Sequence, residues 1–128
     1  MACSFVVTKA TLDNLSRLEN IASELPEAVR VDVEAWDDHP TFQVRGKNFL
    51  FSDLAGSHIT IKLTADEAEA MTAADPAVSD AGYGLGRHGW IAVTIAADES
   101  TARWRQIREW IRTSYQLVAP RQLAAQVS

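Results

Sequence analysis

The sequence predicts a single α+β domain in which helices pack on one face of an antiparallel sheet. Its 128 residues are the length of one domain, and no linker rich in Gly, Ser or Pro divides them. Hydrophobic residues make up 47% of the chain, enough for one core. Their spacing changes along the chain from that of a helix to that of strands, and the resulting order of elements is α, several β, α, β, α.

The first periodic segment predicts a helix over residues 11–25. Apolar residues recur there at steps of three and four, at Leu12, Leu15, Leu18, Ile21, Ala22 and Leu25. Thr11 is the expected N-cap, and Pro26 ends the helix because its ring cannot continue the turn.

The period then changes to two, which is typical of strands. Val29, Val31, Val33 and Ala35 alternate with charged residues, so we expect a strand with its charges in water and its valines toward the core. His39-Pro40 ends this run. Residues 41–44 and 49–52 flank a turn in which Gly46 permits a positive φ, and residues 58–63 form another alternating run. These runs predict an antiparallel meander of three or four strands.

Two further helices and a strand complete the domain. Thr64 and Glu67 have the spacing of a capping box, which predicts a helix that Asp75-Pro76 ends. A glycine-rich stretch precedes a strand over residues 90–96, and the last helix runs from about Ser100 to Val118. One face of that helix is apolar, with Trp104, Ile107, Ile111, Tyr115 and Val118 in a narrow arc that Trp110 and Leu117 extend on one side.

Composition excludes several classes of protein. No uncharged apolar stretch is long enough to span a bilayer, so we expect no membrane association. The single cysteine, Cys3, excludes a disulfide scaffold, and an N-terminus without a basic region before its short apolar run is not a signal peptide. We therefore expect a cytoplasmic protein. The net charge of −5 argues against a whole surface that binds polyanions.

No catalytic or metal-binding constellation stands out. His39, His58 and His88 do not form a ligand pair, and no nucleophile elbow is present. We expect no enzymatic activity, no catalytic residues, no metal and no cofactor.

The stretch Gly84–Gly89 matches the glycine spacing of a dinucleotide-binding turn. That chemistry requires a helix directly after the glycines, whereas a strand follows them here, so we expect a connection between strands. The residues around the glycines, Tyr83, Arg87, His88 and Trp90, are a candidate lining for a small pocket.

Basic residues gather at two turns. Arg45 and Lys47 lie in the first turn, and Arg87 and His88 lie in the second. If both turns project on one side, they form paired wings that can contact phosphates. The alternative is that these are ordinary polar turns, and that the arginines of the last helix pair with Glu99 and Glu109 on a solvated face.

Ordered blocks along the chain resemble the MmcQ/YjbR family. The blocks are residues 25–27, 39–49, 59–63, 89–93 and 114–119. The resemblance implies a compact α+β fold related to type III secretion chaperones. It also implies DNA binding through a double-wing arrangement, whose residues here would be Arg45, Lys47 and Asn48 in one wing and Arg87 and His88 in the other. It brings no enzymatic activity.

Three functional hypotheses follow. The first is a non-catalytic binding module with DNA as its ligand. The second is a protein-interaction domain, binding a partner or a second copy through an exposed sheet edge or the flank formed by Trp110 and Leu117. The third is a small-molecule site in the segment 82–90, near Tyr83, His88 and Trp90.

Overall fold

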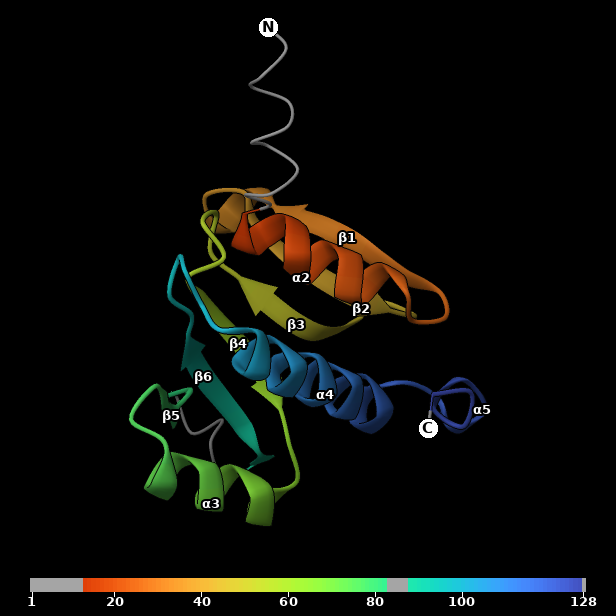
Figure 1. The fold of residues 1–128 in the computed structure, drawn as a ribbon. Helices are drawn as coiled ribbons and strands as arrows, with labels where there is room; N and C mark the ends of the chain where they lie inside the picture. The colour runs from red at the N-terminus through yellow and green to blue at the C-terminus, as the bar shows by residue number, and fades with distance from the viewer. Residues whose placement is uncertain (1–12, 83–87, 128) are drawn as a thin grey trace, which may run out of the picture.

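A computed structural model describes residues 13–82 and 88–127 of the chain, and it has a six-stranded antiparallel sheet with the order β1-β2-β3-β4-β6-β5. Helices α2 and α4 lie across one face of the sheet, and α3 packs beside β5 and β6 (Figure 1). The α+β class with helices on an antiparallel sheet is confirmed. The strands are β1 (Ala28–Val33), β2 (His39–Val44), β3 (Lys47–Ser52), β4 (His58–Lys62), β5 (Val78–Asp80) and β6 (Trp90–Thr94). The helices are α2 (Asn14–Ser23), α3 (Ala65–Ala74), α4 (Thr101–Val118), the short α5 (Arg121–Ala124) and a 3₁₀ turn, η1 (Glu34–Trp36).

Local capping fixes where the helices begin. The Thr64–Glu67 capping box at α3 is confirmed, since Thr64 Oγ1 accepts from the Glu67 backbone and the Glu67 carboxylate accepts from that of Thr64. The expected N-cap of the first helix is wrong. α2 starts one residue after Asp13, whose carboxylate accepts a 2.8 Å hydrogen bond from the Ser16 backbone N–H, whereas Thr11 lies outside the described residues.

The core lies between the sheet and the helices α2 and α4. Trp104 and Trp110 are each 8% exposed, which confirms them as core anchors of α4. Tyr115 packs edge to face against Phe49 with 5.3 Å between ring centroids. The fully buried residues include Leu18, Ala22, Val44, Leu50, Ile61, Ile107 and Ile111.

Several strand boundaries differ from the prediction. β1 ends at Val33, where η1 begins, so Ala35 is not part of the strand, and β6 ends at Thr94 rather than at Ala96. β2 begins at His39 and includes Pro40. The strand tolerates the proline because its missing N–H would point toward β3, and the pairing of β2 with β3 starts only at Thr41. The three-residue strand β5 was not predicted, because so short a run shows no period.

The valines of β1 face the other way from the prediction. Val29 and Val31 are 53% and 37% exposed. Arg30 lies toward α2 instead, where its guanidinium bonds Glu19 at 3.2 Å. β1 is an edge strand. On the face toward α2, the long polar side chain of Arg30 reaches the helix. No helix in the described part of the chain covers the opposite face, where the valines lie.

Candidate functional site

The register of the sheet brings the β2–β3 turn and the start of β6 to the same end. β3 runs antiparallel to β4, so Lys47 at the start of β3 and Lys62 at the end of β4 share that end. Lys62 in turn pairs with Trp90, the first residue of β6. With strands about 4.8 Å apart, β6 begins roughly 10 Å from β3. We call this region the wing end and define it as residues 45–48, Lys62 and residues 88–90.

The first wing is a tight hairpin turn. Arg45 and Gly46 have φ values of +52° and +81°, as a two-residue type I′ turn requires. A Cβ on Gly46 would meet nothing within 4 Å, so this glycine serves the backbone conformation alone. The turn projects Arg45 and Lys47 into solvent.

Glu27 partly neutralises the charge of Arg45. The Arg45 Nε and Nη2 atoms donate hydrogen bonds of 2.6 and 2.9 Å to the two carboxylate oxygens of Glu27. The hydrogen bond from Arg45 lowers the pKa of Glu27, and the bond to Glu27 raises the pKa of Arg45. The pair was not predicted, because these residues lie 18 positions apart and meet only through the β1–β2 pairing.

Lys62 is a basic residue of the wing end that was not predicted as a site residue. It is half-buried and lies on β4, the strand between the two wings. The alternating pattern placed it at the end of a strand, but only the pairing of β4 with β6 puts it between the turns.

A hydroxyl from α4 separates β3 and β4 at the wing end. The register pairs Leu50 with Ile61, so Phe49 and Lys62 would pair next. Ser114 bridges them instead, because its Oγ donates to the Phe49 carbonyl at 2.5 Å and accepts from the Lys62 N–H at 2.9 Å. Beside this break, the half-buried Asn48 side chain has an amide oxygen with no hydrogen-bond partner among the described residues.

The second wing is only partly described. Tyr83 and Arg87 lie outside the described residues, and His88 is exposed. Trp90 is half-buried and packs edge to face on Phe51, with ring centroids 5.7 Å apart. Of the seven predicted site residues, the structure therefore gathers Arg45, Lys47, Asn48, His88 and Trp90 at the wing end.

The negative charge of the chain is concentrated outside the wings. Residues 64–82 contain five acidic and no basic residues, which leaves twelve of each sign in the rest of the chain. The net charge of −5 therefore resides in the stretch from α3 to β5. Two of these acids, Asp66 and Glu67, lie in the first turn of α3, only four and five residues after Lys62, so carboxylates border the wing end on that side.

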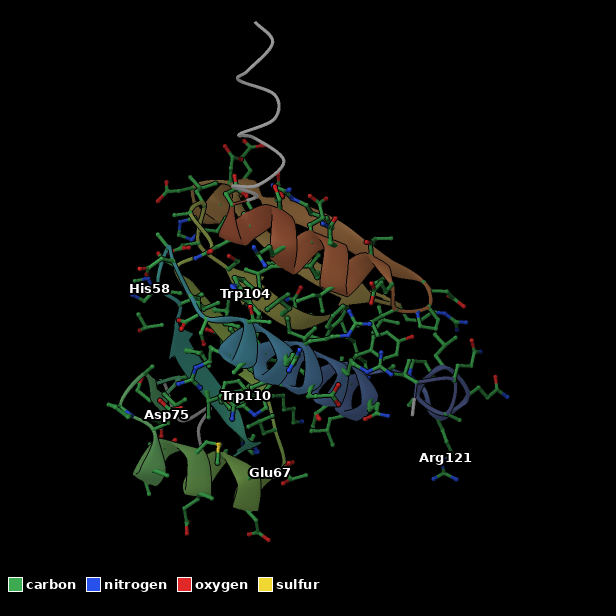
Figure 2. All side chains as sticks on the ribbon, in the orientation of Figure 1. His58, Glu67, Asp75, Trp104, Trp110 and Arg121 are labelled. Atoms are coloured by element: carbon green, nitrogen blue, oxygen red, sulfur yellow. The ribbon has the colours of Figure 1, made fainter. Side chains whose placement is uncertain are left out.

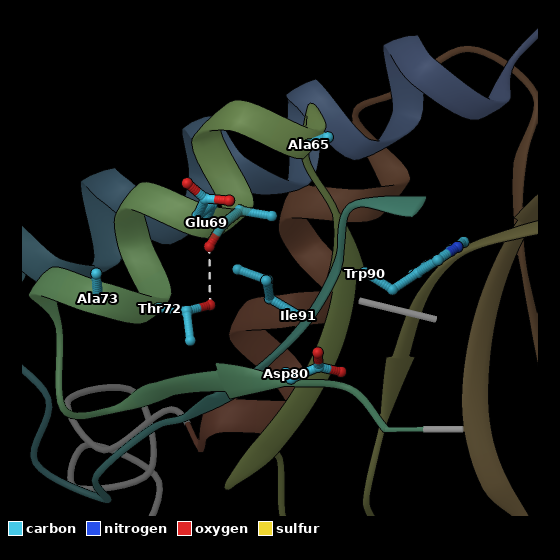
Figure 3. A pocket seen from close by; sticks show the side chains of 8 residues that line it. Ala65, Glu69, Thr72, Ala73, Asp80, Trp90 and Ile91 are labelled. Carbon is cyan, nitrogen blue, oxygen red and sulfur yellow. Dashed lines mark hydrogen bonds between the residues drawn. The ribbon is translucent and has the colours of Figure 1, made fainter. Parts of the chain in front are cut away.

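A pocket of about 650 Å³ lies between α3 and the strands β5 and β6 (Figure 3). Its described lining contains the carboxylates Glu69 and Asp80 and no basic residue. Trp90 contributes to the wall, but Figure 3 shows its ring directed away from α3. With this charge the described lining does not suit a phosphate-bearing ligand such as a nucleotide.

The flank of α4 suggested as a protein-binding surface is not present as predicted. Trp110 is buried, and the Arg103 guanidinium lies 5.6 Å from its ring centroid. Arg103 also pairs with Asp75 at 2.6 Å. Only Leu117, 42% exposed, remains at the surface of that flank.

Asp53, Ser57 and His58 form a cluster at the opposite end of the sheet. His58 begins β4 and pairs with Thr94, whereas Lys62 ends β4 and pairs with Trp90, and Figure 2 shows His58 well above Glu67 in the first turn of α3. The Asp53 carboxylate and the Ser57 hydroxyl both lie 3.1 Å from the same His58 nitrogen, Nδ1. A catalytic triad needs the acid and the nucleophile on different ring nitrogens, so this cluster is a turn stabilised by hydrogen bonds.

The same turn predicts a pH dependence of stability. Burial raises the pKa of Asp53, but hydrogen bonds from Ser57 and His58 outweigh it and lower the pKa to about 2. Since the ordinary pKa is 3.8, the stabilisation is complete above about pH 4 and is lost as the pH falls toward 2. Asp53→Asn should reduce the free energy of unfolding at pH 7 by about 2 kcal/mol and by much less near pH 2. Urea unfolding at both pH values tests this, and an equal loss at both would contradict it.

Within residues 13–82 and 88–127, no group of three or more His, Cys, Asp or Glu side chains is placed to hold a metal ion. The described helices also include none with the length and hydropathy needed to cross a membrane.

The fold is that of a small α+β domain in which helices cover one face of the sheet. The β2–β3 turn and the connection into β6 lie at the same end of that sheet. The family model for YjbR matches residues 23–117, and the chain belongs to this family. The crystal structure of a Deinococcus radiodurans protein with a DUF419 domain has the same fold, with a TM-score of 0.69 and 23% identity. The match covers 84% of this chain and 80% of that one. No curated protein matches the chain.

Proposed function

We propose that the protein is a non-catalytic binding module that contacts nucleic-acid phosphates at the wing end. The observation that supports this most is the register of β3, β4 and β6, which brings Lys47, Lys62 and His88 to one end of the sheet. These side chains lie on three different strands or turns, so they can reach phosphates on a common backbone.

The charges at the wing end make this binding weak and sensitive to salt. Glu27 occupies two of the Arg45 donors, so Lys47 and Lys62 carry most of the available positive charge. For two to three phosphate contacts, the affinity should fall roughly 40- to 200-fold between 20 and 150 mM salt.

Removing the carboxylate that holds Arg45 should strengthen DNA binding. Glu27→Gln frees the Arg45 guanidinium for an additional phosphate, so we expect about a tenfold tighter complex with duplex DNA at 20 mM salt. Fluorescence anisotropy of a labelled duplex measures this. Glu109→Gln is the matched control, because it changes the net charge equally on the exposed surface of α4.

Reversing the charge of the first wing should have the opposite effect. Lys47→Glu should weaken binding at least tenfold, whereas Arg105→Glu, an equal change of charge on α4, should alter it by less than about threefold. Equal losses in the two variants would show that DNA responds only to net charge and would refute a wing-end site.

A further inference from the structure

β1 presents an open edge on the sheet. It is the first strand in the sheet order, and β2 is its only strand partner in the described part of the chain. The Val31 carbonyl accepts a 2.7 Å hydrogen bond from Thr41 Oγ1 on β2, so the backbone groups of the odd-numbered residues point toward β2. Those of Ala28, Arg30 and Asp32 therefore point outward, where another strand can bond to them.

The sequence of β1 is complementary to itself in the antiparallel direction. Residues 29–33 read Val-Arg-Val-Asp-Val, which is symmetric in its valines and opposite in its charges about Val31. When two copies align with Val31 opposite Val31, Arg30 faces Asp32 of the partner subunit and Val29 faces Val33 of the partner subunit. Opposite charges and paired β-branched residues are the favourable cross-strand neighbours.

The same register satisfies the backbone. Arg30 and Asp32, whose backbone groups point outward, become the hydrogen-bonded pairs, and the two Val31 residues become the closely spaced pair between them. Val29 and Val31 are among the most exposed large apolar side chains of the described residues, and this pairing places them beside valines of the partner. On the other face, Arg30 already bonds Asp32 of its own chain at 2.8 Å, so its guanidinium lies where the partner's carboxylate would come.

The helix layer leaves room for a second copy. Figure 1 shows α2 in front of β1 and β2, with α4 beside it across the sheet. Arg17 on α2 lies over the ring of Trp104 on α4, and Glu19 on the opposite side of α2 bonds Arg30. Ser16 and Ser23 lie three and four positions from Glu19, so the side of α2 away from α4 includes these small residues. In each subunit α2 lies over the strand pair β1 and β2, and two strands span about 10 Å. The α2 helices of the two subunits would therefore lie about 10 Å apart, which is a normal separation of packed helices.

We propose that a second copy of this chain pairs with β1 along its outer edge, in the register centred on Val31, and forms a two-fold dimer with a continuous twelve-stranded sheet. An interface of this kind uses the same residues on both subunits. Six-residue edge strands make a small interface, so the dimer dissociates in the micromolar range or above. The proposal is independent of nucleic-acid binding at the wing end.

Light scattering after size exclusion tests the dimer. The 14.1 kDa chain should rise in mean mass toward twice that value as its concentration increases to about 0.5 mM. Val31→Lys places two lysines opposite each other at the two-fold axis and should abolish the rise. Leu117→Lys, at a similarly exposed apolar position on α4, should leave it unchanged. A wild-type chain that stays monomeric, or a Val31→Lys chain that still dimerises, would overturn the proposal.

A charge exchange tests the register itself. Arg30→Asp and Asp32→Arg chains each place like charges opposite each other and should be monomeric alone. Mixed together, they restore two opposite-charge pairs and should form a heterodimer at concentrations where neither forms a homodimer. Circular dichroism confirms that each variant is folded. A mixture of folded variants that stays monomeric would exclude the register centred on Val31.

Discussion

Gly89→Ala should destabilise the protein by roughly 3–5 kcal/mol, the largest effect expected of a single added methyl group among the described glycines. Gly89 has a φ of +91°, which L side chains rarely adopt, and a Cβ there would lie 2.0 Å from the Leu63 carbonyl oxygen. The Leu63 N–H also donates to the Gly89 carbonyl at 2.8 Å, so neither backbone can move without breaking this bond. The contact joins the end of β4 to the start of β6, and therefore the strain falls on the wing end.

Gly46→Ala is the matched control for this prediction. Its φ of +81° is similar, but a Cβ there meets nothing within 4 Å, so only the backbone strain of about 1 kcal/mol remains. The free energies of unfolding of the two variants in urea separate backbone strain from the steric clash with Leu63. Equal losses in both would mean that the close approach of Gly89 to Leu63 does not stabilise the fold.

Ser114→Ala should reduce the free energy of unfolding by about 2–3 kcal/mol. The Ser114 hydroxyl is fully buried and bridges the Phe49 carbonyl and the Lys62 N–H, and alanine leaves both backbone groups without that partner. Thr113→Ala removes a hydroxyl from the adjacent, half-buried position and should cost about 0.5 kcal/mol.

Hydrogen exchange shows how the sheet responds to this variant. If β3 and β4 stay apart in Ser114→Ala, the Lys62 amide has no hydrogen-bond acceptor. Its protection against hydrogen exchange should then fall by the factor that corresponds to the loss in free energy of unfolding. Unchanged stability together with a protected Lys62 amide would mean that the strands close directly, and that Ser114 is not what holds the wing end in shape.

Features set by neighbouring residues could be predicted from the sequence. The Thr64–Glu67 capping box, the turn at Gly46 and the apolar face of α4 each depend on spacings of a few residues, and the structure confirms them. The orientation of β1 could not be predicted, because alternation shows that a strand has two faces but not which face the helices cover. Arg30 reaches α2, and Val29 is left in solvent.

The candidate site also has one part that could be predicted from the sequence and one part that could not. The sequence places Arg45 and Lys47 together in one turn, but the partners that determine their charge come from elsewhere. Glu27 reaches Arg45 through the pairing of β1 with β2, and Lys62 reaches the wing end through the pairing of β4 with β6. Such long-range pairings depend on the topology of the whole sheet, which periodicity does not specify.

Chemical-shift mapping of the ¹⁵N-labelled protein with a short DNA duplex at about 20 mM salt tests the wing-end site most directly. We predict that the amides of residues 45–48, Lys62 and residues 88–90 shift on titration, that the shifts vanish at about 150 mM salt, and that Lys47→Glu removes them. Shifts confined to the arginines of α4, or no shifts at 20 mM salt, would contradict nucleic-acid binding at the wing end.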